Sequence, residues 1–169
     1  MYKVLIVDHE KCSGCKVCEI ICSLYREDQV NPMKARLHVV TWETEGTDIP
    51  MVCQQCEKAP CAEICPVKAI SRDQNTGAMV IDENSCIGCR MCVHACPFGA
   101  PLVRPDTGKV TKCDLCHGDP KCVQFCVTGA LQFLPASKAV LQKKRTAAKK
   151  YGDLMVALHG PHADEERTR

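Results

Sequence analysis

The sequence predicts an α+β fold in which one small cysteine-rich unit is repeated, and three observations support this. The 169 residues include sixteen cysteines, which fall into four groups of four. Aromatic residues make up only 4% of the chain, so side chains alone would fill a thin interior. Short β-prone segments flank turn signals between the groups, at residues 75–77 and 106–108. We therefore expect short hairpins around an interior that bound cofactors help to fill.

The four groups share one asymmetric spacing. The first and third follow C-x2-C-x2-C-x3-C, and the second and fourth widen only the middle gap. Three cysteines so spaced curl a loop around one face of a cubane, while the fourth begins a helix that leads away and ligates the other cluster of a pair. The pattern predicts four [4Fe–4S] clusters, and the candidate ligands are Cys12, Cys15, Cys18, Cys22; Cys53, Cys56, Cys61, Cys65; Cys86, Cys89, Cys92, Cys96; and Cys113, Cys116, Cys122, Cys126.

Two other uses of cysteine fit this pattern less well. A disulfide framework would have to explain four copies of one asymmetric spacing in a chain without an export signal. Structural zinc sites usually pair two C-x2-C knuckles across roughly a dozen residues, with no third cysteine close behind. Nearby histidines such as His9 and His117 have no ligand position to fill, because sixteen cysteines match four cubanes. Ser13, Ser85 and Thr128 could donate hydrogen bonds that tune the clusters, although residues of these types more often cap turns.

Charge and hydropathy limit the partners and the location. The formal net charge is +2, but four oxidised clusters of about −2 each would bring the loaded protein to about −6. We therefore expect no nucleic-acid partner. No apolar run reaches the roughly 18 residues that a membrane-spanning helix needs, and residues 1–8 lack a secretory signal pattern. A cytoplasmic protein with no direct membrane span is expected.

With these motifs the chain resembles the iron–sulfur electron-transfer subunits of molybdenum and tungsten oxidoreductases, which carry four such groups in this order. The resemblance covers residues 1 to about 134 and implies a duplicated bacterial ferredoxin-like fold, with two modules of two [4Fe–4S] clusters. In size and in residues 18–23 the chain is most similar to the small subunits of soluble tungsten aldehyde oxidoreductases and of carbon monoxide dehydrogenase–hydrogenase systems. The aldehyde enzyme is the favoured relative.

The resemblance also implies which cysteines share a cluster, because in that family the first and fourth groups exchange their last cysteines, as do the second and third. The sequence supports this pairing, since proline follows the last cysteine only in the second and third groups, at Pro66 and Pro97. Apolar residues 2–7 and 131–134 are expected to pair as first and last strands. The implied sets are Cys12, Cys15, Cys18 with Cys126; Cys113, Cys116, Cys122 with Cys22; Cys53, Cys56, Cys61 with Cys96; and Cys86, Cys89, Cys92 with Cys65.

The function implied by the resemblance is electron transfer without catalysis. Electrons would enter at one end cluster and leave at the other. The expected partners are a catalytic tungsten or molybdenum subunit and a flavin- or NAD-linked subunit or a ferredoxin. The same cysteines would also serve a free polyferredoxin shuttle, or the iron–sulfur subunit of a carbon monoxide dehydrogenase–hydrogenase or formate dehydrogenase system.

Residues 135–169 differ in composition from the four-cluster domain, 1–134. Six Lys or Arg and no acid occur between residues 136 and 152, and Ser137 is positioned to cap a helix with an apolar stripe. We predict a basic helical extension and a mobile tail from 160 to 169. The extension either packs on the cluster domain or docks another subunit, and it is the expected adhesive in any head-to-tail self-association.

Overall fold

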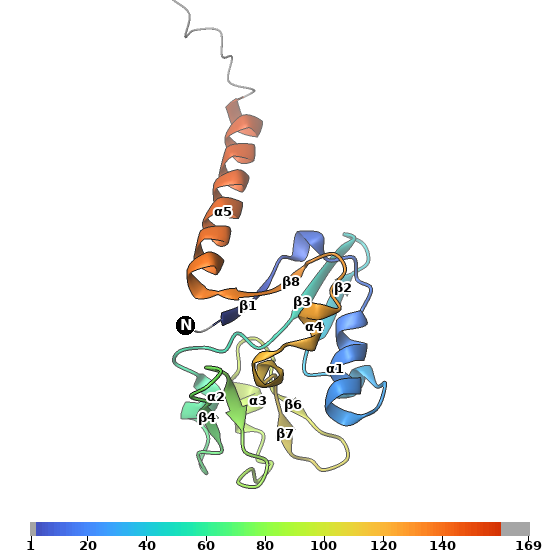
Figure 1. The fold of residues 1–169 in the computed structure, drawn as a ribbon, viewed down its shortest axis with the longest axis vertical. Helices are drawn as coiled ribbons and strands as arrows, with labels where there is room; N and C mark the ends of the chain where they lie inside the picture. Colours follow the sequence, from blue (N-terminus) through green and yellow to red (C-terminus); the bar gives the residue numbers. More distant parts are fainter. Residues whose placement is uncertain (1–2, 160–169) are drawn as a thin grey trace, which may run out of the picture.

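The computed structural model describes residues 3–159, and its strands form antiparallel pairs (Figure 1). The predicted mobile tail, 160–169, lies outside the described residues. Each pair is a two-stranded sheet of its own. The pairs are β1 (Lys3–Val7) with β8 (Leu131–Pro135), β2 (His38–Trp42) with β3 (Thr47–Met51), β4 (Ile70–Arg72) with β5 (Met79–Ile81), and β6 (Leu102–Val103) with β7 (Val110–Thr111).

Short helical segments lie between these sheets, and one long helix follows the last strand. The mixture of short helices and small strands is the α+β class that the sequence predicts, whereas the duplication of a ferredoxin unit stays a prediction. The segments are η1 (His9–Lys11), α1 (Val17–Glu27), η2 (Pro32–Lys34), α2 (Pro60–Glu63), α3 (Met91–Ala95), η3 (Leu115–Gly118), α4 (Lys121–Gln124) and α5 (Ala136–His159).

The first and last strands pair, as the sequence predicts. Lys3 lies opposite Pro135, and Val7 lies opposite Leu131. The backbone N–H of Asp8 extends the pairing by donating to the carbonyl of Ala130 at 2.8 Å. This sheet joins segments more than a hundred residues apart, so it brings the start of the first cysteine group to the end of the fourth.

The expected turns between cysteine groups are also present as hairpins. Residues 73–78 connect β4 to β5, and residues 104–109 connect β6 to β7. In the first turn Asp73 accepts hydrogen bonds from the backbone N–H groups of Asn75 and Thr76, both at 3.2 Å. Gly77 and Gly108 have φ of +73° and +67°, a left-handed conformation that glycine adopts without a Cβ clash.

Buried side chains form two cores, and cysteines contribute to both. In the first core Leu37, Val39 and Leu131 pack with Cys18, Cys22 and Cys122. In the second core apolar side chains of the β4–β7 region pack with Cys61 and Cys92; these apolar residues include Ile70, Met79 and Val110. The first core thus draws on the first and fourth cysteine groups, and the second core draws on the second and third.

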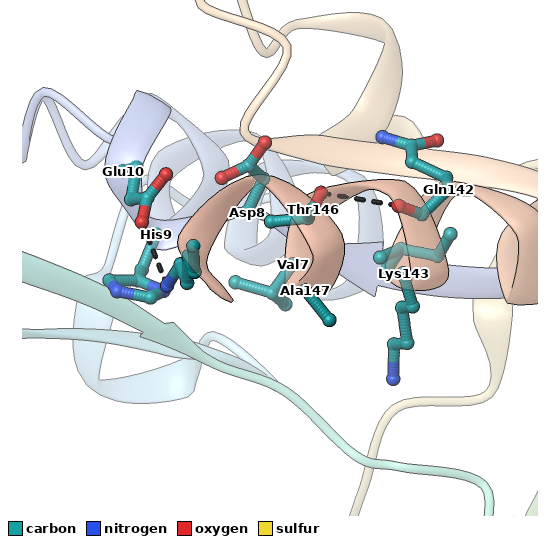
Figure 2. A pocket seen from close by; sticks show the side chains of 10 residues that line it. Val7, Asp8, His9, Glu10, Gln142, Lys143, Thr146 and Ala147 are labelled. Atoms are coloured by element: carbon teal, nitrogen blue, oxygen red, sulfur yellow. Dashed lines mark hydrogen bonds and ion pairs between the residues drawn. The ribbon is translucent and has the colours of Figure 1, made fainter. Parts of the chain in front are cut away.

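The helix after the last strand, α5, leads away from the body of the domain (Figure 1). It begins at Ala136, directly after β8, so the prediction that Ser137 caps it is wrong: Ser137 lies in the first turn. Lys150 on α5 pairs with Glu10 of η1 at 2.8 Å. Both residues line a cavity between α5 and the segment 6–10, and Figure 2 shows Glu10 with other lining residues. Several apolar residues of α5 are exposed to solvent, and Leu154 is 54% exposed. The helix therefore packs on the domain only in part.

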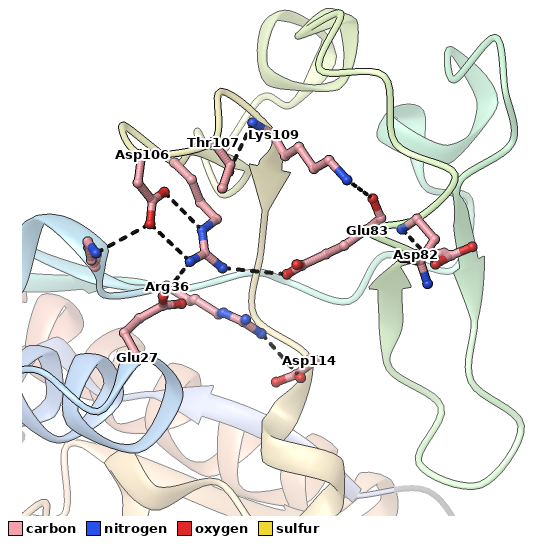
Figure 3. Close-up of polar contacts among 11 residues, drawn as sticks. Glu27, Arg36, Asp82, Glu83, Asp106, Thr107, Lys109 and Asp114 are labelled. Atoms are coloured by element: carbon pink, nitrogen blue, oxygen red, sulfur yellow. Dashed lines mark hydrogen bonds and ion pairs between the residues drawn. The ribbon is translucent and has the colours of Figure 1, made fainter.

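A network of ion pairs ties the first core to the β6–β7 hairpin (Figure 3). Nη2 of Arg104 lies 2.8 Å from Oε2 of Glu27, at the end of α1, and 3.2 Å from Oδ2 of Asp106. The side chain of Glu27 is only 6% exposed. The hydrogen bond from Arg104 holds the pKa of the Asp106 carboxyl well below its usual range. A separate ion pair nearby joins Asp114 to Arg36 at 3.2 Å.

We predict that Arg104→Ala destabilises the holoprotein, because the buried Glu27 carboxylate loses its nearest cation. We expect a loss of about 2 kcal/mol, below the usual cost of breaking a fully buried pair because Arg104 is partly exposed. Glu83→Ala is the matched control, since Glu83 is 48% exposed and 3.8 Å from Arg104, and should change stability by less than about 0.5 kcal/mol. Anaerobic denaturation followed by circular dichroism measures both, and equal effects would contradict the network's role.

Candidate cluster-binding sites

Two cavities in the second core are each lined by four cysteines. In each cavity three cysteines come from one sequence group, and the fourth is the last cysteine of the other group. We name them site 3, lined by Cys53, Cys56, Cys61 and Cys96, and site 4, lined by Cys65, Cys86, Cys89 and Cys92.

The cysteines of the first and fourth groups come together in the first core. Cys12 and Cys126 pack against the same buried cluster. Burial raises the pKa of Cys12, and the neighbouring Cys15 and Cys126 add to the shift. Burial also raises the pKa of Cys122, with added contributions from Cys113, Cys22 and Cys116. These neighbours agree with the sets that the resemblance implies, and we refer to Cys12, Cys15, Cys18 and Cys126 as site 1 and to Cys22, Cys113, Cys116 and Cys122 as site 2.

Influences between cysteines connect the four sites in the order 1, 2, 3 and 4, which we call the row of sites. At each junction, burial is the main cause of a raised cysteine pKa, and a cysteine of the adjacent site raises it further. The three pairs that link site 1 to 2, 2 to 3 and 3 to 4 are Cys18 with Cys122, Cys53 with Cys113, and Cys61 with Cys92. Among the described cysteines the exposed ones are Cys15, in site 1, and Cys89, in site 4. The two ends of the row are thus its most accessible parts.

A turn of helix positions the third cysteine of every group. This corrects the expectation that a helix begins at the fourth cysteine. In α2 the reason is local, because Pro60 occupies the first helical position, where its fixed φ favours the helix and its missing N–H has no cost. The third cysteine is the second residue of its helix in all four groups, at Cys18 in α1, Cys61 in α2, Cys92 in α3 and Cys122 in α4.

Left-handed backbone closes the loop between the first two cysteines of each group. The residue before the second cysteine has positive φ in all four, and at Gly88 an added Cβ would lie 3.0 Å from the carbonyl oxygen of Gly108. Gln55 adopts the same conformation with a full side chain, which donates to the Cys113 carbonyl at 3.0 Å and accepts from the Met79 N–H at 2.7 Å. These two bonds fix the loop of site 3 against site 2.

The last cysteine of every group accepts a backbone hydrogen bond. Such bonds favour the thiolate, which is the form that ligates iron, and bonds to cluster sulfurs are one determinant of potential. Although burial acts to raise the pKa of Cys126, bonds from the Leu131 N–H and the Thr128 hydroxyl lower it overall. The four donors are the N–H groups of Arg36 to Cys22 and Ala69 to Cys65, both at 3.3 Å, and of Ala100 to Cys96 and Leu131 to Cys126, both at 3.4 Å.

Other residues near the cysteines have partners of their own. Ser85 donates to Asp82 at 2.5 Å, which makes it a turn residue rather than a donor to a cysteine. Nε2 of His117 lies 3.3 Å from Nη1 of Arg26. Sequence reasoning missed Lys112, which is 3% exposed and lines site 3; only its place beside Cys113 could have drawn attention to it. Within residues 3–159, no three Cys, His, Asp or Glu side chains are arranged for a single metal ion.

Two family models match the protein. A 4Fe-4S dicluster domain matches residues 45–135, and a 4Fe-4S binding domain matches residues 9–27. The protein is therefore a ferredoxin-type iron–sulfur protein. It belongs to the 4Fe-4S dicluster family, whose model covers more than half of its length. Across the described residues, no helix is long and apolar enough to cross a membrane.

Curated relatives agree with this family. The polyferredoxin-like subunit of aliphatic sulfonate oxidoreductase from Pyrococcus furiosus is 43% identical over 122 residues, which cover 72% of this protein and 70% of that one. The electron transport protein HydN of Escherichia coli is 36% identical, covering 87% and 98%. The thiosulfate reductase electron transfer subunit PhsB of Salmonella typhi is 32% identical, covering 83% and 79%. The protein is thus a non-catalytic electron-transfer protein.

We predict that Gly88→Ala destabilises the protein more than Gly99→Ala. Both glycines have positive φ, so both variants carry a left-handed alanine that costs about 1–2 kcal/mol. Only at Gly88 does the new Cβ meet backbone, the Gly108 carbonyl, which adds about 1 kcal/mol; around Gly99 there is open space. Thermal denaturation of the two anaerobic holoproteins compares them directly. Equal midpoints would show that site 4 does not depend on this close approach.

Proposed function

We propose that the protein relays single electrons through four [4Fe–4S] clusters, one at each of sites 1 to 4. The observation that carries the proposal is the pair of cavities lined by four cysteines each, in which every cavity draws on two sequence groups. Four thiolates are the ligand set that a [4Fe–4S] cluster requires. When bound, each cluster supplies a one-electron couple. The protein supplies the ligands, the spacing and the insulation.

The walls of the cavities suit this cofactor. Besides its cysteines, site 4 is lined mainly by aliphatic side chains, among them Ile70, Ile81 and Val110. Site 3 adds Met79 and Phe98. Apolar walls exclude water, and solvent exposure is one of the factors that set the potential of an iron–sulfur cluster. The backbone bonds to the last cysteines supply a second factor. The same fold can therefore hold four clusters at different potentials.

The row of sites gives the relay two ends, and partners would dock there. Cys15 at site 1 and Cys89 at site 4 are exposed. Apolar side chains surround these ends: Ile87, beside Cys89, is 65% exposed, and Val127, beside Cys126, is 94% exposed. Exposed apolar residues that gather around a functional group are typical of protein interfaces. We therefore place electron entry and exit at sites 1 and 4.

The proposed partners are a catalytic oxidoreductase subunit and a second redox protein. Relatives named as subunits of a sulfonate oxidoreductase and of a thiosulfate reductase support a catalytic partner. The finer proposal, a tungsten or molybdenum aldehyde oxidoreductase with a flavin- or NAD-linked subunit, rests on the sequence resemblance. The basic helix α5, with its exposed apolar residues, is the proposed docking arm. A reducing cytoplasm would keep the sixteen thiols available for iron.

Substitution of single cysteines tests the exchange of ligands between groups. The wild-type holoprotein should contain about sixteen irons, from four cubanes of four irons each. Cys22→Ser should perturb the same paramagnetic resonance signal as Cys116→Ser, because both residues belong to site 2. Cys15→Ser, in site 1, is the matched control and should perturb a different signal.

Local ligation within each group makes the opposite prediction. If Cys22→Ser changed the signal that Cys15→Ser changes and spared the one lost in Cys116→Ser, the exchanged ligand sets would be wrong. A wild-type protein with eight irons, or with stoichiometric zinc, would contradict the four-cluster relay itself.

A further inference from the structure

Lys112 is a buried cation in the middle of the row of sites. It follows β7 and directly precedes Cys113, and only 3% of it is exposed. Its ammonium Nζ donates hydrogen bonds to the carbonyl oxygen of Met79, on β5, and to that of Cys113 at 3.2 Å. None of the ion pairs among residues 3–159 includes Lys112. A lysine is rarely buried so fully without a negative partner.

Lys112 lies next to both site 2 and site 3. Its side chain lines the cavity of site 3, and its backbone is bonded to Cys113 of site 2. Gln55 makes a similar connection, because its side chain also joins the Cys113 carbonyl to Met79. Lys112 and Gln55 thus form a polar bridge where the two cores meet, and of the two only Lys112 carries charge.

Other cations near this junction have partners of a different kind. Arg72 donates to the carbonyls of Cys56 and Gly77, both at 2.6 Å, and so holds the outer side of the site 3 loop. Arg36 pairs with the carboxylate of Asp114 at 3.2 Å, which offsets its charge. Lys112 lines site 3 with Cys61 and donates to the carbonyl of Cys113 in site 2, and within residues 3–159 no carboxylate forms an ion pair with it.

We propose that Lys112 is the shared counter-cation of the clusters at sites 2 and 3 and raises their reduction potentials. The proposal rests on the proposed function, because it requires those two sites to hold clusters. A [4Fe–4S] cluster with four thiolates gains one negative charge on reduction, so a fixed cation in a poorly solvated interior stabilises the reduced form more than the oxidised form. The same charge reduces the repulsion between the two middle clusters.

Redox titration of full-length holoprotein variants tests this role. Lys112→Met removes the charge and the donor, and Lys112→Gln removes the charge while keeping a donor. In both variants we expect reduction of at least one middle cluster to become at least tenfold less favourable, a downward shift of about 59 mV for one electron. The middle clusters are identified by the signals lost in Cys116→Ser and Cys56→Ser. Lys109→Met is the matched control, since Lys109 donates to the Glu83 carbonyl in an exposed turn.

Each outcome decides the proposal. Neutral variants that keep sixteen irons but shift neither middle potential beyond the Lys109→Met control would overturn it and leave the relay intact. If the neutral variants lose iron, Lys112→Arg decides between the two explanations. Four clusters with near-wild-type potentials in this variant would support a role for the charge. Loss of iron in this variant as well would show that Lys112 acts by packing alone. If Cys56→Ser, made in the wild-type background, removed no paramagnetic resonance signal, site 3 would hold no cluster. That result would refute the proposed function rather than the role of Lys112.

Discussion

The crossing of the last cysteine in each group into the site of another group is the constraint on which the proposed four-cluster arrangement depends. Each group supplies three cysteines from one short loop, and no loop of this length surrounds a cubane. The fourth sulfur must therefore come from elsewhere in the sequence. At sites 3 and 4 the crossing joins the second and third groups, and at sites 1 and 2 it joins the first and fourth. The pairing of β1 with β8 follows from the same need, since it brings Cys12 and Cys126 to one end.

This constraint also explains how the protein can fold with little apolar side-chain volume in its interior. The two cores contain few large residues, and cysteines occupy their centres. Burial raises the pKa of Cys18 to about 12 and that of Cys113 to about 12, so a metal that binds these thiols must displace their protons. Metal binding therefore contributes directly to the free energy of folding. The backbone bonds to the last cysteines and the Arg104 network hold the loops in place for it.

Sequence reasoning predicted what repeats and missed what occurs once. The cysteine spacing and the turns at 75–77 and 106–108 follow from local signals, and the pairing of the first and last strands follows from the family resemblance. The helix starts were misplaced, because the left-handed residue that precedes α1 or α3, Lys16 or Arg90, carries no sequence signal for that conformation. Lys112, Gln55 and Arg104 were missed for another reason: their roles depend on partners from distant segments, which are brought together only when the protein folds.

The positions of the irons test the central claim most directly. An anaerobic crystal structure of the holoprotein, with iron located by anomalous scattering, should show four separate cubanes in a row, with Cys22 bound in the site of Cys113 and Cys96 bound in the site of Cys53. Neighbouring cubanes should lie in the order of sites 1, 2, 3 and 4, with Lys112 between the middle two. Four cubanes each bound by the four cysteines of one sequence group, or a branched arrangement of the sites, would contradict the account.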